Sequence, residues 1–213
     1  MVWLARSGAP WRDLPERYGS WQTVYSRFRK WIDDGILDNI FRILSLEAEL
    51  EELSIDASIV QAHHIAQVLK RGASNEIGHS RGGASTKIHA IVDSYGYPVY
   101  FMISEGQRND INYAIPLLDH IEIDGSKVLA DRGYDSNQLI DYIYDHGGEP
   151  TIPSRRGAKF ERRCDWWFYK ERHLVENYFL KLKAFRRIAT RYDKLAFTYL
   201  GFLCIVSILI WLK

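Results

Sequence analysis

The hydrophobic periodicity of this chain changes from helical to extended near Leu53, and this change constrains the fold more than any other feature. Before it, apolar residues recur every three or four positions, as in amphipathic helices. After it come short runs rich in β-branched residues and separated by turns. The pattern predicts a small helical segment followed by a sheet that helices cover, which is an α/β fold of the α+β kind.

The second part of the chain predicts five strands with helices between and after them. The predicted strands are LSIDASIVQA (53–62), STKIHAIVD (85–93), YPVYFMIS (97–104), KVLAD (127–131) and PTIP (150–153). The predicted helices are INYAIPLLDHI (111–121), NQLIDYIYDHG (137–147) and a long run from Tyr169 to Lys194. Three strands in a meander, followed by alternating strands and helices, indicate a mixed sheet within a domain of residues 51–213.

Residues 1–50 predict a separate helical segment. Ser20 can N-cap a helix in which large apolar residues recur at helical spacing, and a third helical run spans residues 36–50. Arg29 and Lys30 lie on the polar face of the helix that follows Ser20. A turn followed by a basic helix is what a helix-turn-helix protein offers to DNA, although helical hairpins without DNA binding share the pattern. We expect Arg29 and Lys30 to contact DNA.

The positive charge of the chain is concentrated in residues 154–194. This segment holds thirteen Lys and Arg against five Asp and Glu, a net charge of +8, whereas the whole chain carries only +1. The rest of the chain is therefore acidic, with a net charge of −7. Such an asymmetry indicates a polyanionic partner. We expect Arg186 and Arg187 to contact DNA phosphates.

The cysteines and the apolar C-terminus bear on where the protein resides. Cys164 and Cys204 show neither a disulfide framework nor zinc-ligand spacing, and no secretory leader opens the chain, which favours a reducing cytoplasm. The apolar run of residues 197–212 has sixteen residues, and about twenty are needed to span a bilayer. We expect a buried core helix there and no membrane partner.

One acid lies inside a predicted strand and a second acid ends another predicted strand. Asp56 lies inside the first strand, where an unpaired carboxylate is costly, and Asp131 ends the strand KVLAD. Ligands commonly bind at the carboxyl ends of strands in open sheets. Each acid also has a local interpretation, because Asp56 could bond a neighbouring backbone group and Asp131 could cap the turn. Asp135 or Ser136 is a more suitable cap for the helix that follows.

The long predicted helix carries a third acid within an organised polar stripe. With about 100° per residue and Glu176 at zero, Tyr169 lies near +20°, Arg172 near −40° and Lys183 near −20°. The opposite face is expected to hold the helix on the core through Trp167, Leu174, Tyr178, Leu182 and Phe185. A solvated charged face with an Arg172–Glu176 pair is the alternative interpretation of the stripe.

Asp56, Asp131 and Glu176 together suit hard divalent cations, because carboxylate oxygens are the ligands that such ions prefer. A site of this kind can hold two ions, Mg²⁺ or Mn²⁺. One ion activates the attacking oxygen of a phosphodiester reaction and the other stabilises the leaving oxygen.

These motifs carry a resemblance to a known family. IDASIVQAHHIA, GHSRGGASTKIHAIVDSYGYPVYF, EGQRNDINYAIPLLD, VLADRGYDS and RHLVENYFLKLKAFRRIATRYDKLA closely resemble the DDE transposases of bacterial insertion sequences, in the family named for insertion sequence five. The spacing from Tyr169 through Arg172 and Glu176 to Lys183 matches that family's Tyr-Arg-Glu-Lys signature. The resemblance covers nearly the whole chain.

The resemblance implies a ribonuclease H-like catalytic fold with Asp56, Asp131 and Glu176 as the metal-binding triad. It also implies DNA or active-site contacts for Arg172 and Lys183. Members of the family usually have more helical sequence before LARSGAPWRDLPERYG, so the DNA-binding segment is expected to be shortened here. The implied partners are double-stranded DNA and further copies of the chain, as a homodimer or a higher assembly.

Other signals are weaker. His63, His64 and His89 are scattered without close ligand spacing, and we assign them no role. Residues 79–87 (HSRGGASTK) lack the order of a P-loop, and a DNA-contact loop that links a hairpin is the better interpretation. Neither cysteine has a base near it in the sequence that would make it a nucleophile.

Three functions remain open from the sequence. The first is a metal-dependent transposase that hydrolyses a phosphodiester at the ends of its element and transfers the strand. The second is a truncated, non-catalytic remnant that binds DNA or full-length transposase and inhibits transposition. The third is a nuclease that shares the site but joins no strands.

Overall fold

The computed structural model describes residues 1–67, 76–158 and 161–213. The α-helices are α1 (Val2–Ser7), α2 (Trp21–Asp33), α3 (Ile36–Ser45), α4 (Ile111–Leu118), α5 (Asn137–Asp145), α6 (Trp166–Tyr169), α7 (His173–Lys183), α8 (Arg186–Ala189) and α9 (Ala196–Trp211). The strands are β1 (Glu52–Ala62), β2 (Gly78–Ser80), β3 (Gly83–Val92), β4 (Pro98–Glu105), β5 (Lys127–Leu129), β6 (Glu149–Thr151) and β7 (Thr190–Arg191). Five 3₁₀ turns are η1 (Trp11–Asp13), η2 (Glu16–Tyr18), η3 (His64–Gln67), η4 (Arg132–Tyr134) and η5 (Lys170–Arg172).

The strands form one mixed sheet, as predicted. β1 pairs antiparallel with β3, and β3 pairs antiparallel with β4. On its other side β1 pairs parallel with β5, and β5 pairs parallel with β6. The resulting path β4–β3–β1–β5–β6 is a three-stranded meander extended by two parallel strands, each reached through a helix. This topology is ribonuclease H-like.

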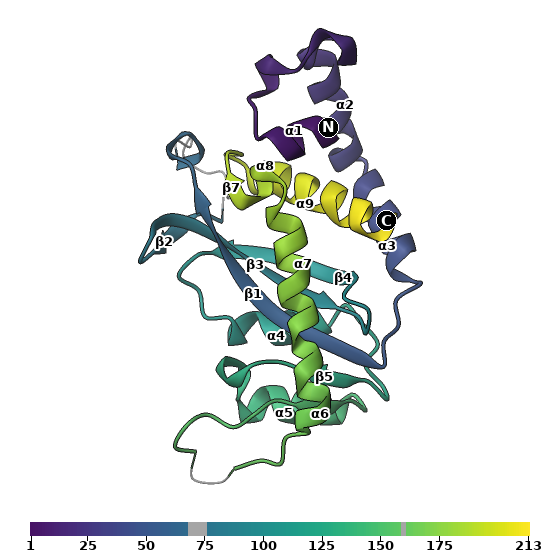
Figure 1. Cartoon of the computed structure of the whole chain (residues 1–213), viewed down its shortest axis with the longest axis vertical. Coiled ribbons are helices and arrows are strands. Elements are labelled where there is room, and N and C mark those ends of the chain that lie inside the picture. The colour runs from purple at the N-terminus through teal and green to yellow at the C-terminus, as the bar shows by residue number, and fades with distance from the viewer. Residues whose placement is uncertain (68–75, 159–160) are drawn as a thin grey trace.

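Helices cover both faces of the sheet, and each face has its own hydrophobic core. Figure 1 shows α7 crossing one face, with α9 and the N-terminal helices beyond it. Val60, Ile88 and Ala90 point to that face and share a core with α7 and α9. Leu53, Ile55 and Ile91 point to the other face and pack with α4 and α5. The alternation along β1 and β3 follows from the period of two in a strand.

The N-terminal helices share the first of these cores. Ser20 caps α2, because its hydroxyl accepts a hydrogen bond from the Thr23 N–H at 3.3 Å, as predicted. Phe28 of α2 is fully buried and its ring lies 4.7 Å from that of Phe202 in α9. Leu37 and Phe41 of α3 belong to the same buried cluster. Residues 1–50 therefore pack on the rest of the chain, and the division at residue 50 stays a prediction.

The apolar C-terminal run forms α9, and most of its side chains are buried, as expected for a core helix. Tyr199, Phe202 and Leu203 are fully inaccessible to solvent. In the part of the chain that the structure describes, no helix has the length and apolarity needed to cross a membrane.

The single long helix predicted from Tyr169 to Lys194 is wrong. The chain passes from α6 through η5 into α7, and it leaves the helix at Phe185, which has extended backbone angles of φ −94° and ψ 111°. This bend places the Phe185 ring in the core, where the side chain is 6% exposed. Trp167 does not hold the helix on the sheet, because it precedes α7 on α6 and is 76% exposed.

Candidate active site

Asp56 lies on β1, and both of its carboxylate oxygens have partners. Oδ1 accepts a hydrogen bond from the Ala57 N–H at 2.7 Å, and Oδ2 accepts one from Arg172 Nη1 at 3.0 Å. Burial raises the pKa of Asp56, the Ala57 N–H and Arg172 oppose this effect, and the charges of Asp131 and Glu176 add to it. The three acids of the predicted triad are thus electrostatically coupled.

Asp131 is placed beside Asp56 by the parallel pairing of their strands. Ser54 of β1 pairs with Leu129 of β5, and each acid follows its strand partner by two residues. Asp131 also caps η4, because its Oδ1 accepts a hydrogen bond from the Gly133 N–H at 2.7 Å. Ser136 caps α5, so Asp131 is not needed as the cap of that helix. The local interpretations of Asp56 and Asp131 are therefore both realised, within one carboxylate pair.

Glu176 reaches the same place from α7, and Arg172 connects it to Asp56. Arg172 forms ion pairs with both carboxylates: Nη1 contacts Asp56 Oδ2, and Nη2 contacts Glu176 Oε1. Burial, the largest single effect, lowers the pKa of Arg172, but the two carboxylates together raise it. One guanidinium thus balances part of the charge of three acids, and the site retains a net negative charge that favours a cation.

Lys183, at the end of α7, contacts β1 just beyond Asp56. Its Nζ donates to Ser58 Oγ at 2.6 Å and to the Ile59 carbonyl at 3.2 Å. Burial lowers the pKa of Lys183. Lys183 therefore fastens the end of α7 to the strand that carries Asp56, and its contact with DNA stays a prediction.

The donor chemistry of the site fits a divalent metal, but the present arrangement of side chains does not form a ligand group. Within the described residues, no three His, Cys, Asp or Glu side chains lie close enough together to hold a metal ion. The guanidinium of Arg172 lies between Asp56 and Glu176 and pairs with both. Carboxylate oxygens are the ligands that hard divalent cations prefer.

Behind the carboxylates, on the α4 side of the sheet, lies a buried polar layer that the sequence analysis did not identify. Lys87 Nζ forms an ion pair with Asp110 Oδ1 at 2.7 Å, and His89 Nε2 shares a hydrogen bond with Ser104 Oγ at 2.8 Å. Tyr134, in η4, is 1% exposed. No local pattern signals this layer, because its members come from different strands and turns and meet only in the folded chain.

The structure gives the neighbouring residues Arg186 and Arg187 different environments. Arg186 is exposed, as a DNA contact requires. Arg187 is 3% exposed and forms two hydrogen bonds with the Asp193 carboxylate, at 3.0 and 2.8 Å. Its guanidinium also lies over the Phe202 ring at 4.5 Å. The predicted DNA contact of Arg187 is therefore wrong, because its charge is buried and paired inside the core.

The other basic candidates on α2 are held by local ion pairs. Arg29 pairs with Asp33 at 3.0 Å, and its guanidinium lies 4.0 Å from the centre of the Phe197 ring in α9. Lys30 pairs with Asp34 at 3.2 Å. Exposed pairs four residues apart on a helix contribute only a few tenths of a kcal/mol, so both cations remain available to a phosphate.

The remaining sequence signals fall into ordinary structural places. The rings of His63 and His64 contact each other in a tilted arrangement, with their centres 4.1 Å apart. Residues 79–87 belong to the β2–β3 hairpin, and they hold the buried Lys87. Both cysteines are free, and Cys204 is buried with its thiol donating to the Leu37 carbonyl.

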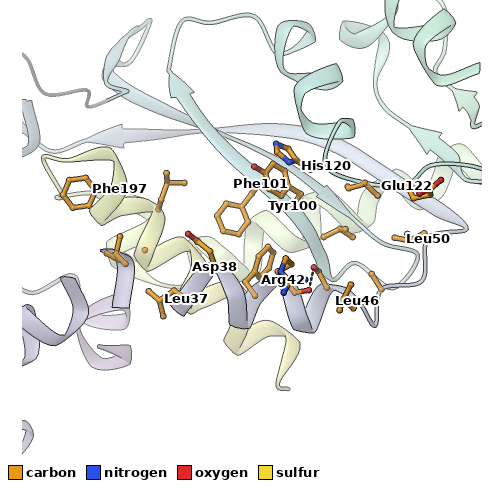
Figure 2. A pocket seen from close by; sticks show the side chains of 18 residues that line it. Leu37, Asp38, Arg42, Leu46, Leu50, Tyr100, Phe101, His120, Glu122 and Phe197 are labelled. Atoms are coloured by element: carbon orange, nitrogen blue, oxygen red, sulfur yellow. Dashed lines mark hydrogen bonds between the residues drawn. The ribbon is translucent and has the colours of Figure 1, made fainter. Parts of the chain in front are cut away.

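A cavity of 780 Å³ lies away from the acids, between α3, β4 and the start of α9. Figure 2 shows Phe101, Tyr100 and His120 along one side of it and Leu37, Asp38 and Arg42 along the other. Asp56, Asp131 and Glu176 do not line it. The position of the carboxylates, and not the size of this cavity, identifies the candidate active site.

The chain thus combines a ribonuclease H-like mixed sheet with carboxylates on β1, after β5 and on α7. A family model described as "Transposase DDE domain" matches residues 47–211. A second model, described as a putative transposase of the IS4/5 family, matches residues 1–41. The chain belongs to the family of DDE-domain transposases, as its resemblance to insertion-sequence transposases implied.

Three curated relatives are similar over part of the chain. A putative transposase for insertion sequence element IS6501 of Brucella ovis is 35% identical over 133 residues, which are 61% of this chain and 99% of the relative. The uncharacterized protein y4sN of Sinorhizobium fredii is 48% identical over 71 residues, 33% of this chain and 57% of the relative. A putative transposase for insertion sequence element IS402 of Burkholderia cepacia is 31% identical over 133 residues, 58% of this chain and 61% of the relative. The matched regions thus span little more than half of the last two relatives.

Solved structures with some likeness are also transposases. The Mos1 transposase paired-end complex with left transposon end aligns with a TM-score of 0.35 and 15% identity, over 100% of this chain and 75% of that chain. The piggyBac transposase synaptic complex with hairpin DNA aligns with a TM-score of 0.37 and 18% identity, over 52% of this chain and 24% of that chain. At these scores the likeness adds nothing to the topology described above.

Proposed function

We propose that the chain hydrolyses phosphodiester bonds at the ends of an insertion sequence and joins the freed 3′-hydroxyl to target DNA. The observation that carries this proposal is the placement of Asp56 on β1 and Asp131 after the neighbouring strand β5, with Arg172 pairing Asp56 to Glu176 of α7. Mg²⁺ or Mn²⁺, bound by these carboxylates as two ions, would activate the attacking oxygen and stabilise the leaving oxygen. Membership of the family supports this assignment.

The residues around the carboxylates have separate tasks in this proposal. The pairing of β1 with β5 holds Asp56 and Asp131 on a rigid support, while α7 presents Glu176 from the other side. Arg172 connects Asp56 and Glu176 through an ion pair with each. Its planar fork suits a phosphate equally well, so the same guanidinium can turn to the DNA backbone when a cation takes over the charge of the carboxylates.

The proposed partners are double-stranded DNA and further copies of the chain. Among the described residues of 154–194, seven cations are exposed: Arg155, Arg156, Arg163, Lys170, Lys181, Arg186 and Lys194. Cations that line a DNA backbone supply affinity independent of sequence, and recognition of particular ends needs contacts with base edges. Arg29 and Lys30 on α2 are the candidates for those contacts. A homodimer or a higher assembly would bring two element ends together.

The proposed function is tested with DNA that carries the element ends, Mg²⁺ or Mn²⁺, and the full chain. Joined products support a transposase. Binding without cleavage would instead indicate a non-catalytic inhibitor, and nicking without joining would indicate a simple nuclease.

The triad is tested by three isosteric variants in the same assay. Asp56→Asn, Asp131→Asn and Glu176→Gln should each reduce cleavage by about a thousandfold or more, because charge stabilisation by the metal is worth several kcal/mol. Asp34→Asn, on α2 and in an exposed ion pair with Lys30, is the matched control and should cleave normally. Normal cleavage by one of the three variants would remove that residue from the site.

A further inference from the structure

A second cavity, of 590 Å³, lies where α1, the end of α7 and the end of α9 meet, and its charged side chains are all cations. They are Arg6 of α1, Lys181 of α7 and Lys213. Among the described residues, no Asp or Glu lines the cavity. Lys213 also carries the terminal carboxylate of this sequence, so Arg6 and Lys181 supply the net positive charge. Like charges that converge on one hollow repel each other, and the lining therefore favours an anionic ligand.

Both cations lie over aromatic rings. The Arg6 guanidinium is 5.5 Å from the centre of the Phe185 ring, and Lys181 Nζ is 5.9 Å from the centre of the Tyr97 ring. In the part of the chain that the structure describes, neither cation has a carboxylate partner, whereas the cations of α2 each pair with an acid four residues on. An aromatic ring attracts a cation without neutralising it. Arg6 and Lys181 therefore keep their charge for another partner.

The cavity and the carboxylates lie on different sides of α7, which crosses the sheet (Figure 1). Lys181 is about 140° from Glu176 around the helix axis. Lys183, on the Glu176 side, contacts Ser58 of β1 at 2.6 Å, whereas Lys181 lies over Tyr97, which directly precedes β4. The strands β1 and β4 flank β3 on opposite sides. A ligand in the cavity therefore does not compete with a metal ion for the carboxylates.

The floor of the cavity is apolar and firmly packed. Phe185 and Ile210 line it and are only 6% and 7% exposed. The Tyr97 ring stacks on that of Trp211 at 4.6 Å, and Trp211 Nε1 donates a hydrogen bond to the Pro98 carbonyl at 2.9 Å. Cations above an apolar floor suit a phosphate that carries organic substituents better than a bare ion, whose whole surface needs polar partners.

We propose that this cavity binds a backbone phosphate of DNA at a position outside the cleavage site. Arg6 and Lys181 contact the phosphate oxygens, and the adjoining sugar lies against Phe185 and Ile210. This inference rests on the proposed function, because it takes DNA as the partner. Phosphate contacts fix the position of DNA without reading its sequence. The cavity thus determines how DNA lies across α7, while the carboxylates act on the bond that is cleaved.

The test measures the DNA affinity of the full chain against salt concentration, without divalent cations. A double variant, Arg6→Gln with Lys181→Gln, should weaken binding to all sequences alike and flatten the slope of log affinity against log salt by about 0.9, the value for one phosphate contact. Ala184→Trp keeps both charges but fills the cavity from the exposed end of α7, and it should cause the same loss. Arg42→Gln, on α3, removes an exposed cation that does not line the cavity, and this matched control should keep the wild-type slope. The unfolding temperature of each variant verifies that it is folded.

A wild-type slope in the double variant would overturn the inference. A wild-type slope in Ala184→Trp alone would overturn it as well, because the two cations would then act through the general field and not through the cavity. Inorganic phosphate, compared with chloride at equal ionic strength, tests for a small free anion. If it raises the unfolding temperature of the wild type but not of Ala184→Trp, while DNA binding is the same in both, the cavity is a site for free phosphate and not for DNA.

The measurement also separates this inference from the function on which it rests. A wild-type chain that binds DNA but neither cleaves nor joins it would overturn the proposed function and leave the cavity as a DNA contact, because the readout is binding alone. Normal cleavage and joining by the wild type, together with unchanged DNA binding by both cavity variants, would overturn only the role of the cavity. A wild-type chain without affinity for DNA would overturn both.

Discussion

Two adjacent arginines show how burial decides what a charged residue does. Arg186 and Arg187 are indistinguishable in a count of basic residues, yet Arg186 is exposed and Arg187 is 3% exposed against Asp193. A buried ion pair costs desolvation energy when it forms, and the loss of one partner leaves the other charge buried and unpaired. The two residues must therefore respond differently to the same substitution.

We predict that Arg187→Ala destabilises the fold by about 3–5 kcal/mol, and lowers the unfolding temperature on the order of 10 °C. Arg186→Ala should leave the unfolding temperature within a degree or two and should flatten the dependence of log affinity for DNA on log salt by about 0.9, the value for one phosphate contact. Thermal unfolding and a salt titration of DNA binding check both statements. Equal stability of the two variants would contradict the burial of Arg187.

His89 makes stability depend on pH in a predictable direction. Burial, aided by the nearby Lys87 charge, lowers the pKa of His89 from its ordinary 6.5 to about 3. The groups that face its ring are Lys87, Ser104, Asp110 and Tyr113. Because the unfolded chain binds a proton between these two pKa values and the folded chain does not, stability falls as the pH falls through this window.

We predict that His89→Gln, which keeps a hydrogen-bond group for Ser104, reduces this loss of stability in acid. The slope attributable to His89 is at most about 1.4 kcal/mol per pH unit between pH 6.5 and 3. Urea unfolding at several pH values measures it as the difference between the wild type and the variant. Parallel curves over the whole window would show that His89 accepts its proton in the folded chain.

At the scale of elements, the bend after α7 separates two functions of one basic segment. Up to Lys183 the chain follows the sheet and presents Arg172 and Glu176 to β1. After Phe185 it turns into α8, which packs on α1 and α9. An amphipathic pattern gives no sign of a change in the direction of the helix axis. The sequence therefore suggested one helix where the structure has α6, η5, α7 and α8. The stripe of Arg172, Glu176 and Lys183 survives because it ends before the bend.

The packing of the N-terminal helices in residues 1–45 also concerns the scale of elements. α1, α2 and α3 all contact α9, and the rings of Phe28 and Phe202 meet in the shared core. An independent domain would be expected to enclose its own core. These helices instead complete the core that α7, α9 and one face of the sheet share, although a family model matches residues 1–41 separately.

We predict that deletion of residues 1–46 yields a chain that aggregates or unfolds without cooperativity, because it exposes the fully buried Phe202 and Leu203 of α9. Phe28→Ala is the milder variant and should cost about 3–5 kcal/mol in one global transition. Circular dichroism during thermal unfolding follows both. A truncated chain that unfolds cooperatively at the wild-type temperature would establish residues 47–213 as an autonomous domain.

At the scale of the whole molecule, the exposed cations of the basic segment and the three acids of the site come mostly from different elements. Among the described residues of 154–194, six exposed cations lie before or after α7 and Lys181 lies on it, whereas Asp56 lies on β1 and Asp131 follows β5. A polyanion can therefore be attracted by the first group while the carboxylates remain available for cations.

The sequence by itself determined the order and kind of the main elements. The strands around Asp56 and Asp131, the hairpin of β3 and β4 and the buried helix α9 follow from local periodicity and turn residues, and these signals act over a few neighbouring positions. Glu176 was identified in the same way, since residues four apart on a helix share a face. The spacing within one helix sufficed to place it beside Arg172.

Only the tertiary structure decided which charges meet and which are buried. Arg172 lies 116 residues from Asp56 in the chain, and its guanidinium pairs with the Asp56 carboxylate. The burial of Arg187 depends on the segment after α1, on α8 and on α9 closing around it. Such contacts join segments that are remote in sequence, and their energies depend on solvent exclusion, which exists only once the whole chain has packed.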